Sequence, residues 1–185
     1  QYMGEKTETH DYSRMYREKL MDYRREVEAV VKLEKPSNIP RAKALGYKAK
    51  PGIIVARVRI LKGGGLHLRP NRARKPKRMG VNNLTRKKNI RTMAEERAQK
   101  RFPNMEVLNS YWIGEDGQRK YFEVILVDPF NPSVKSDKSL RWIVEPQHRG
   151  RVYKGKTSAG QKGRGLHNPA GAKGPEKIRP SLRAN

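Results

Sequence analysis

The sequence predicts a mixed α/β fold, in which helices and strands form a core that carries a long basic loop and a basic C-terminal extension. Two observations support this prediction. Apolar residues recur at spacings of three and four in some segments and at alternate positions in others, patterns that are typical of helices and of strands respectively. Charge divides the chain into two near-neutral blocks, which can fold, and two strongly basic blocks, in which little can be buried.

The basic blocks are unusually long. The chain has 43 Lys and Arg against 18 Asp and Glu, a formal net charge of +25 in 185 residues. Residues 35–94 hold 18 basic residues and no acidic one, and residues 146–185 hold ten basic residues and one acidic residue. Short charge runs are usually solvated surface, but 60 residues without an acid form the footprint expected of nucleic-acid binding.

We expect three units along the chain: an N-terminal amphipathic helix within residues 1–36, an α/β core at 37–145 with a basic loop at 62–88, and a Gly-rich extension at 146–185. The helix is predicted over residues 12–34. Pro36 ends its pattern. Its apolar stripe has spacings of three and four and consists of Tyr12, Tyr16, Leu20, Tyr23, Val27 and Val30.

Residues 37–52 read as a basic linker, and Ile53–Leu61 predicts a strand with one apolar face and a second face that carries Arg57 and Arg59. The loop at 62–88 follows, opened by three consecutive glycines. A loop of this length in a small domain is usually functional or disordered.

The core continues with a helix over residues 89–102, which Pro103 ends. Asn89 can cap it, and Thr92 with Glu95 offers an alternative capping box. Residues 107–113 and 121–127 predict a hairpin around the turn sequence GEDG. The second strand is apolar on both faces, so it should be central. Residues 142–144 could add a short edge strand.

The extension from residue 146 loses periodicity and has seven glycines between positions 150 and 174. We therefore expect a cationic tail without a core of its own.

One motif points elsewhere. Gly150–Thr157 matches the phosphate-binding loop of nucleotide hydrolases, and Val124–Asp128 resembles the apolar strand that ends in a magnesium-binding Asp. That loop requires a strand before it and a helix after it. Pro146–Arg149 is poor strand material, and glycines at 160, 163 and 165 disfavour a helix. A nucleotide hydrolase remains the alternative hypothesis, although the context disfavours it.

The sequence gives little support for a metal site, a cofactor site or an active site. Cysteine is absent, and the four histidines lie far apart without a carboxylate at ligand spacing, so we expect no metal, no cofactor and no catalytic residues. Glu115 and Asp116 are better explained as a polar hairpin tip than as an acid–base pair. No apolar run is long enough to span a membrane. We expect a cytoplasmic protein that is not an enzyme and has no small-molecule substrate.

RNA is a better match than DNA for the basic segments. Their scattered Gly and Pro favour extended backbone over helices that read a DNA groove, and no helix-turn-helix, zinc finger or basic zipper is visible. Extended Lys and Arg side chains can pass between folded RNA helices and neutralise phosphates there. A chromatin-type DNA-binding protein stays as a second alternative.

Several segments carry a family pattern: GYKAKPG at 46–52, MAEERA at 93–98, VLNSYWIGED at 107–116, YFEVILVDP at 121–129 and TSAGQKGRGL at 157–166. In these segments the chain resembles the large-subunit ribosomal protein fifteen family of archaea and eukaryotes, and its end, EKIRPSLRAN, resembles archaeal members. The resemblance implies an α+β fold with a small, mainly antiparallel sheet covered by helices. It implies a structural, non-catalytic component of the large ribosomal subunit. It also implies large-subunit rRNA and neighbouring ribosomal proteins as partners.

We expect most contacts to be with RNA phosphates, and base stacking on Tyr47 and Tyr153. The predicted RNA-binding cations are Lys48, Lys50, Arg57, Arg59, Arg72, Arg74, Lys75, Lys77, Arg78, Arg86, Lys87, Lys88, Arg149, Arg151, Lys154, Lys156, Lys162 and Arg164.

Overall fold

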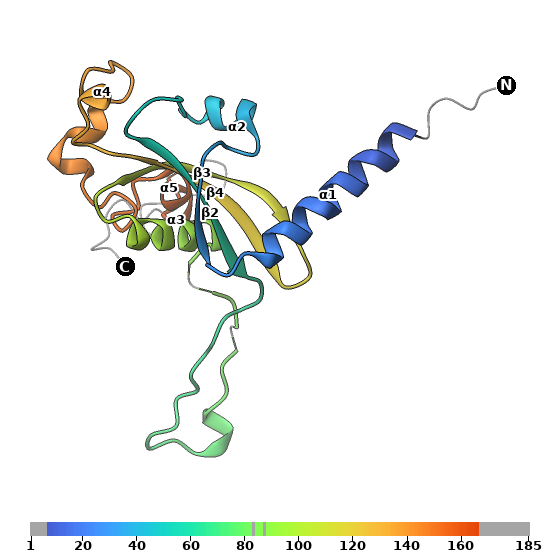
Figure 1. The fold of residues 1–185 in the computed structure, drawn as a ribbon. Helices are drawn as coiled ribbons and strands as arrows, with labels where there is room; N and C mark the ends of the chain where they lie inside the picture. The colour runs from blue at the N-terminus through green and yellow to red at the C-terminus, as the bar shows by residue number, and fades with distance from the viewer. Residues whose placement is uncertain (1–6, 83, 87, 167–185) are drawn as a thin grey trace.

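A four-stranded antiparallel sheet organises the fold, as the computed structural model shows (Figure 1). The structure describes residues 7–82, 84–86 and 88–166. The strands are β1 (Val30–Leu33), β2 (Ile53–Leu61), β3 (Glu106–Glu115) and β4 (Arg119–Val127), in the order β1-β2-β4-β3. The predicted α+β class with a mainly antiparallel sheet is confirmed.

The two central strands are the ones with the strongest apolar patterns. β2 pairs with β4 along its whole length, from Ile53 opposite Val127 to Leu61 opposite Arg119. Residues 121–127 of β4 are all buried. The predicted strand at 53–61, the hairpin and the central position of its second strand are therefore confirmed.

Both faces of the sheet are covered, and each has its own core. On one face, Ala94 and Ala98 of α3 (Ile90–Arg101) pack with Val58 and Val124. On the other, Ala42 of α2 (Ile39–Ala44) and Val134 of α4 (Pro132–Lys135) pack with Val55 and Ile125. The expectation that β2 has only one core face is wrong, because Ile53 and Val55 are buried on the second.

Helix α3 begins and ends where the sequence predicts. The Asn89 side chain accepts a hydrogen bond from the Arg91 amide at 3.1 Å, and the helix closes at Phe102, before Pro103. Ala94 and Ala98 lie one turn apart on the face toward the sheet, and their small side chains allow close approach.

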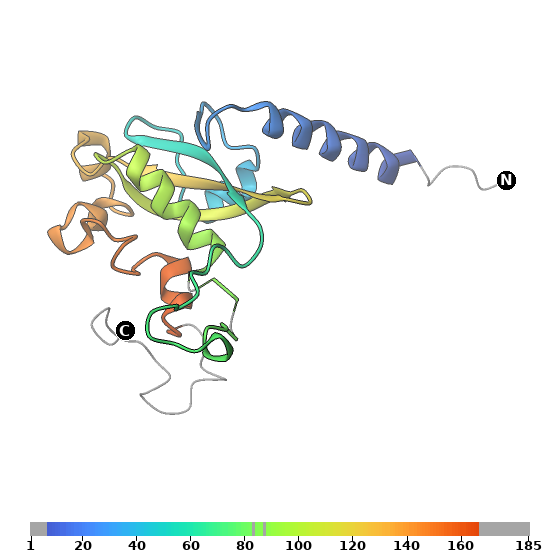
Figure 2. The same ribbon diagram turned by 90° about the horizontal axis from the view of Figure 1, so that it is seen from below.

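The N-terminal helix is shorter than predicted. Helix α1 spans Thr7–Arg25, and residues 30–33, predicted to be helical, form edge strand β1 instead. The β-branched pair Val30 and Val31 favours a strand, and β2 offers a free edge on which to pair. Leu20 and Tyr23 anchor the end of α1 on Tyr121, and the Tyr16 hydroxyl accepts a hydrogen bond from the Glu115 amide at 3.1 Å, while the N-terminal part of the helix extends away from the sheet (Figure 2).

Two further local predictions are wrong. The linker at 37–52 contains α2, whose first turn has Pro40 and is capped by the Asn38 side chain, an N-terminal signal that the sequence does show. Residues 142–144 belong to the 3-10 helix η2 (Arg141–Val144), not to a strand. A three-residue turn brings Leu140 and Ile143 to the same side, where both are buried.

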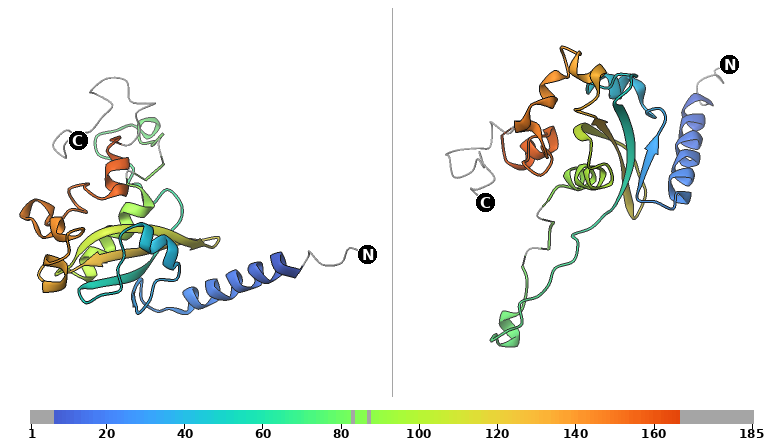
Figure 3. Two further views of the ribbon diagram at one scale, coloured as in Figure 1. Left: turned by 90° about the horizontal axis from the view of Figure 1, so that it is seen from above. Right: turned by 60° about the vertical axis from the view of Figure 1, so that its left-hand side comes forward.

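The first part of the C-terminal extension packs on the core. Residues 146–166 form the short 3-10 helix η3 (Pro146–His148), a series of turns and helix α5 (Ser158–Gly163). They cover α3 on the side away from the sheet (Figure 3, right). Val152 joins the core of that face and Ala159 is also buried. The expectation of a tail without packed structure is wrong for residues 146–166; residues 167–185 lie outside the described part.

Polar anchors explain this docking. Arg151 is buried and donates from Nη1 to the carbonyls of Val107 and Leu108, at 2.6 and 2.8 Å, on the outer edge of β3. Arg91 donates to the Ser110 carbonyl on the same strand, at 2.5 Å. Hydrophobic periodicity does not detect anchors of this kind.

The Glu95 carboxylate joins three segments of the chain. It is fully buried on α3 and accepts hydrogen bonds from Ser110 Oγ of β3 at 2.5 Å and from Thr157 Oγ1 of the extension at 2.6 Å. Burial raises the pKa of Glu95, and these two hydrogen bonds oppose the rise because they stabilise the charged form.

We predict that Glu95→Ala lowers the free energy of unfolding by about 2–4 kcal/mol, because two buried hydroxyls lose their acceptor and a void remains. Residues 150–166 should also become sensitive to protease. Urea unfolding and limited proteolysis measure the two effects. Glu96→Ala is the matched control, since Glu96 pairs only with the exposed Lys88. Equal destabilisation by both variants would contradict the role given to Glu95.

Candidate nucleic-acid interface

The loop at 62–88 stands away from the folded core (Figure 1). Residues 68–78 are exposed throughout, and near the tip the chain turns through the 3-10 helix η1 (Pro76–Arg78). Ala73, next to that turn, has φ +52°, the only positive φ outside glycine among the described residues. The loop therefore presents its side chains to solvent on a narrow projection.

Five cations gather at the end of this projection, and none has a hydrogen-bond or ion-pair partner within the described part of the chain. No acidic residue occurs anywhere between positions 35 and 94. The site thus concentrates positive charge where the described part of the chain supplies no counter-charge. The five are Arg72, Arg74, Lys75, Lys77 and Arg78.

The base of the loop is held firmly. Arg86 donates to the carbonyls of Gly63 and Lys62, at 2.7 and 3.2 Å. The Lys62 amide bonds to the Gln118 carbonyl in the hairpin turn, at 2.7 Å. The sequence predicted Arg86 as an RNA contact, but its guanidinium group binds the carbonyls that close the base of the loop.

Lys48 and Lys50 share one carboxylate. Their Nζ atoms lie 2.7 and 2.5 Å from Asp137 Oδ2, and Lys48 also reaches Ser139 Oγ at 2.7 Å. The hydrogen bonds from Lys48, then Lys50, hold the pKa of Asp137 far below its usual value. The basic segment at 46–52 is therefore tied to the α4 region by charge.

Arg57 and Arg59 bind the segment that connects α1 to β1. Arg57 pairs with Glu26 and lies over the Tyr23 ring, 4.1 Å from its centroid. Arg59 donates to the Glu26 and Val27 carbonyls, at 2.5 and 2.6 Å. Burial opposes charge on Arg57, but the hydrogen bond to Glu26 and the attraction of the nearby Glu26, Tyr23 and Glu123 side chains together outweigh it and raise the arginine pKa.

The cations of the extension divide into two groups. Arg151 is buried in the edge of β3, Lys156 donates to the Gln147 carbonyl at 2.7 Å, and Arg164 donates to the Gly155 carbonyl at 3.2 Å. Exposed side chains without a partner in the described residues are those of Arg149, Lys154 and Lys162.

The remaining predicted contacts lie near the base of the loop and in the turns. Lys88 pairs with Glu96 at 2.8 Å, and Lys87 lies outside the described residues. Tyr47 is half-buried against the core below α2, whereas Tyr153 is 46% exposed. Of the two tyrosines, Tyr153 has the ring surface that a base could stack on.

The apparent nucleotide-binding loop has another role. The residues before Gly150 form η3 rather than a strand. Thr157 Oγ1 donates to Glu95, and Lys156 Nζ donates to Gln147, so both groups are used inside the fold. Helix α5 does follow, contrary to the sequence expectation, because Thr157 caps it and Gly160 packs directly against the Gly155 backbone. The motif match does not build a phosphate site.

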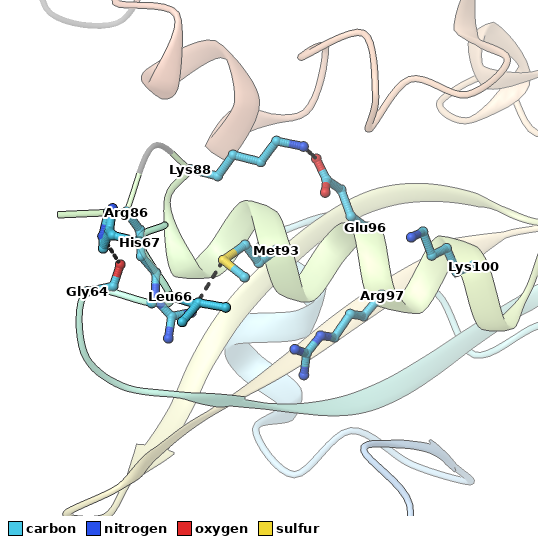
Figure 4. Close-up of a pocket in the computed structure, with 10 residues that line it drawn as sticks. Gly64, Leu66, His67, Arg86, Lys88, Met93, Glu96, Arg97 and Lys100 are labelled. Atoms are coloured by element: carbon cyan, nitrogen blue, oxygen red, sulfur yellow. Dashed lines mark hydrogen bonds and ion pairs between the residues drawn. The ribbon is translucent and has the colours of Figure 1, made fainter. Parts of the chain in front are cut away.

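Sequence reasoning missed two cations beside the loop. Arg97 and Lys100 lie on the exposed face of α3 and, with Lys88 and Arg86, line a cavity at the base of the loop (Figure 4). Their spacing of three on a helix whose other face is apolar was a usable signal.

The described residues show neither a metal site nor a membrane-spanning helix. No group of three or more His, Asp or Glu side chains there could hold a metal ion. No described helix is long and apolar enough to cross a membrane.

The sequence matches known proteins along its whole length. A family model described as Ribosomal L15 covers residues 1–185. The large ribosomal subunit protein eL15 of Methanospirillum hungatei JF-1 is 55% identical over 168 residues, 91% of this chain and 84% of that protein. The protein of the same name from Methanocella arvoryzae is 53% identical over 171 residues, 92% of this chain and 86% of that protein.

We predict that Asp137→Asn lowers the melting temperature near neutral pH and that the difference from the parent shrinks as the pH falls below about 4. Because the pKa of Asp137 is lower in the folded protein than in the unfolded chain, its charged form stabilises the fold at pH values above the unfolded-state pKa. That stabilisation is lost as the pH falls from the unfolded-state pKa toward the folded-state pKa. Thermal melting at pH 6, 4 and 3 measures it. Asp22→Asn, which removes only an exposed pair with Arg25, should change little; a difference independent of pH would refute the assignment.

Proposed function

The chain belongs to the Ribosomal L15 family, and from this premise we propose that it stabilises folded rRNA through phosphate contacts made by its projecting loop and its C-terminal extension. Members of this family are structural components of the large ribosomal subunit in the cytoplasm. The chain is accordingly a ribosomal protein and not an enzyme. A place in that subunit implies rRNA and other ribosomal proteins as neighbours.

The observation that carries the proposal is the set of unpaired cations on the loop. Each partner-free Lys or Arg can neutralise one phosphate and release its condensed counterions. The five loop cations project beyond the core (Figure 1), where they could enter a space between RNA helices. Arg149, Lys154 and Lys162 give the extension the same chemistry on the α3 side of the molecule.

The cations with internal partners support the proposal in another way. Arg86 closes the base of the loop, and Arg151 fixes the extension to β3. Lys48 and Lys50 hold their segment against Asp137. These contacts give the free cations a fixed origin on the core, so binding requires less ordering of the protein than for a free tail.

Most of these contacts should position the protein without reading sequence, because phosphates are the same at every nucleotide. Selectivity for one place in the subunit then comes from the shape of the folded RNA.

We predict that replacing Arg72, Arg74, Lys75, Lys77 and Arg78 together with Gln flattens the dependence of log Kobs on log salt by about 3.5–4.5 units, since each phosphate contact contributes about 0.7–0.9. Filter binding to large-subunit rRNA between 50 and 400 mM salt measures the slope. Urea unfolding should be unchanged, because none of the five contributes a described contact to the core.

The matched control removes the same number of charges from α1, by replacing Arg14, Arg17, Lys19, Arg24 and Arg25 with Gln. It should leave most of the slope in place. Equal slopes for the two variants would mean that net charge, rather than the loop, governs binding, and the proposed role of the loop would fail.

A further inference from the structure

A cavity of about 600 Å³ lies between the base of the basic loop and helix α3 (Figure 4). Its volume is in the range of pockets that hold a small molecule. Leu66 from the loop and Met93 from α3 give it apolar walls, and more apolar than polar surface lines it. It is formed by two segments that are both basic, so it combines an apolar interior with a cationic border.

The backbone at the base of the loop gives the cavity a fixed wall. A Cβ atom on Gly64 would come within 1.9 Å of the Leu84 carbonyl oxygen, and Gly65 has φ +84°, so glycine is required at both positions. Arg86 fastens this wall through the Gly63 carbonyl and also donates to Met93 Sδ at 3.5 Å. The cavity therefore does not depend on side-chain packing alone.

Leu66 is unusual for a residue in a cationic loop. It is 91% exposed although its side chain is fully apolar. Leu68, two residues further on, is 86% exposed but does not line the cavity. A single exposed leucine is common on protein surfaces, but Leu66, unlike Leu68, adds apolar surface to the lining of a cavity that a ligand can enter.

The border of the cavity is positive. Four cations line the cavity, Arg86, Lys88, Arg97 and Lys100, together with one carboxylate, Glu96, which pairs with Lys88 at 2.8 Å. The Lys100 side chain has no partner among the residues that the structure describes. A ligand with an apolar, flat part and an attached anion matches both the walls and the border, and an RNA nucleotide has this chemistry.

We propose that this cavity receives one unpaired rRNA nucleotide, with its base against Leu66 and Met93 and its flanking phosphates beside Arg97 and Lys100. The inference rests on the proposed function and assigns one of its contacts to a base rather than to backbone. An unpaired base that leaves the RNA stack can be recognised in this way, whereas phosphate contacts alone cannot distinguish one nucleotide from the next.

Photo-crosslinking tests the site. The photoreactive residue p-benzoylphenylalanine replaces Leu66 in one variant and Leu68 in the control, and both are assembled into large subunits. We expect the residue at position 66 to crosslink to a single rRNA nucleotide, mapped by reverse transcription, and the residue at 68 to spare that nucleotide. Crosslinks from position 66 to protein, or spread over many nucleotides, would overturn the proposal. If neither variant sedimented with large subunits or crosslinked to RNA, the proposed function itself would have failed.

A second measurement avoids the bulky probe. Leu66→Ala should raise the 2′-hydroxyl acylation of the crosslinked nucleotide by about fivefold, because a base that loses its contact becomes more mobile. Leu68→Ala, an equal change of an equally exposed leucine, should leave that reactivity unchanged. Identical reactivity in the two variants would exclude a base in the cavity.

Discussion

The ion pairs that fasten the basic block at residues 35–94 to the core all use carboxylates from other parts of the chain. Between residues 35 and 94 the chain has many cations and no acid, so a cation there can form an ion pair only with an acid from outside the block. Glu26 comes from the N-terminal block to Arg57, and Asp137 from the second neutral block to Lys48 and Lys50. Where no carboxylate arrives, as at the end of the loop, the backbone leaves the core.

Backbone carbonyls supply the remaining partners. Arg59, Arg86 and Arg151 each donate to two or more carbonyl oxygens. Arginine is suited to this because its several donors are arranged on one rigid plane. The same residue type therefore serves two purposes in this protein: buried arginines fasten segments to the sheet, while exposed arginines remain available to phosphate.

Sequence patterns predicted the parts of the fold that depend on local order. Ile53–Leu61 alternates cleanly, Asn89 marks the start of α3, and the turn between β3 and β4 has its own glycines. The patterns failed where contacts between residues far apart in the sequence determine the local structure. Val30 continues the spacing of α1 but pairs with Val58 in the sheet. Thr157 and Arg151 dock the extension through polar contacts with α3 and β3, which no periodicity records.

The sequence predicted only part of the candidate site. The distribution of charge along the chain identifies its basic segments, including all five cations at the end of the loop. Which cations are occupied could not be predicted, because Asp137 lies more than 80 residues from Lys48 and Lys50. The contribution of Arg97 and Lys100 was also missed, since they belong to a near-neutral block and join the basic loop only in the folded chain.

The arginine contacts on β3 affect the protein before it reaches its subunit. β3 lies at the margin of the sheet, and an open margin invites pairing with a strand from another molecule. The guanidinium groups of Arg91 and Arg151 already occupy the outward carbonyls of Val107, Leu108 and Ser110. These contacts therefore disfavour pairing between the β3 edges of two copies before the chain is incorporated into the subunit. The positive charges of the two arginines also repel a second copy.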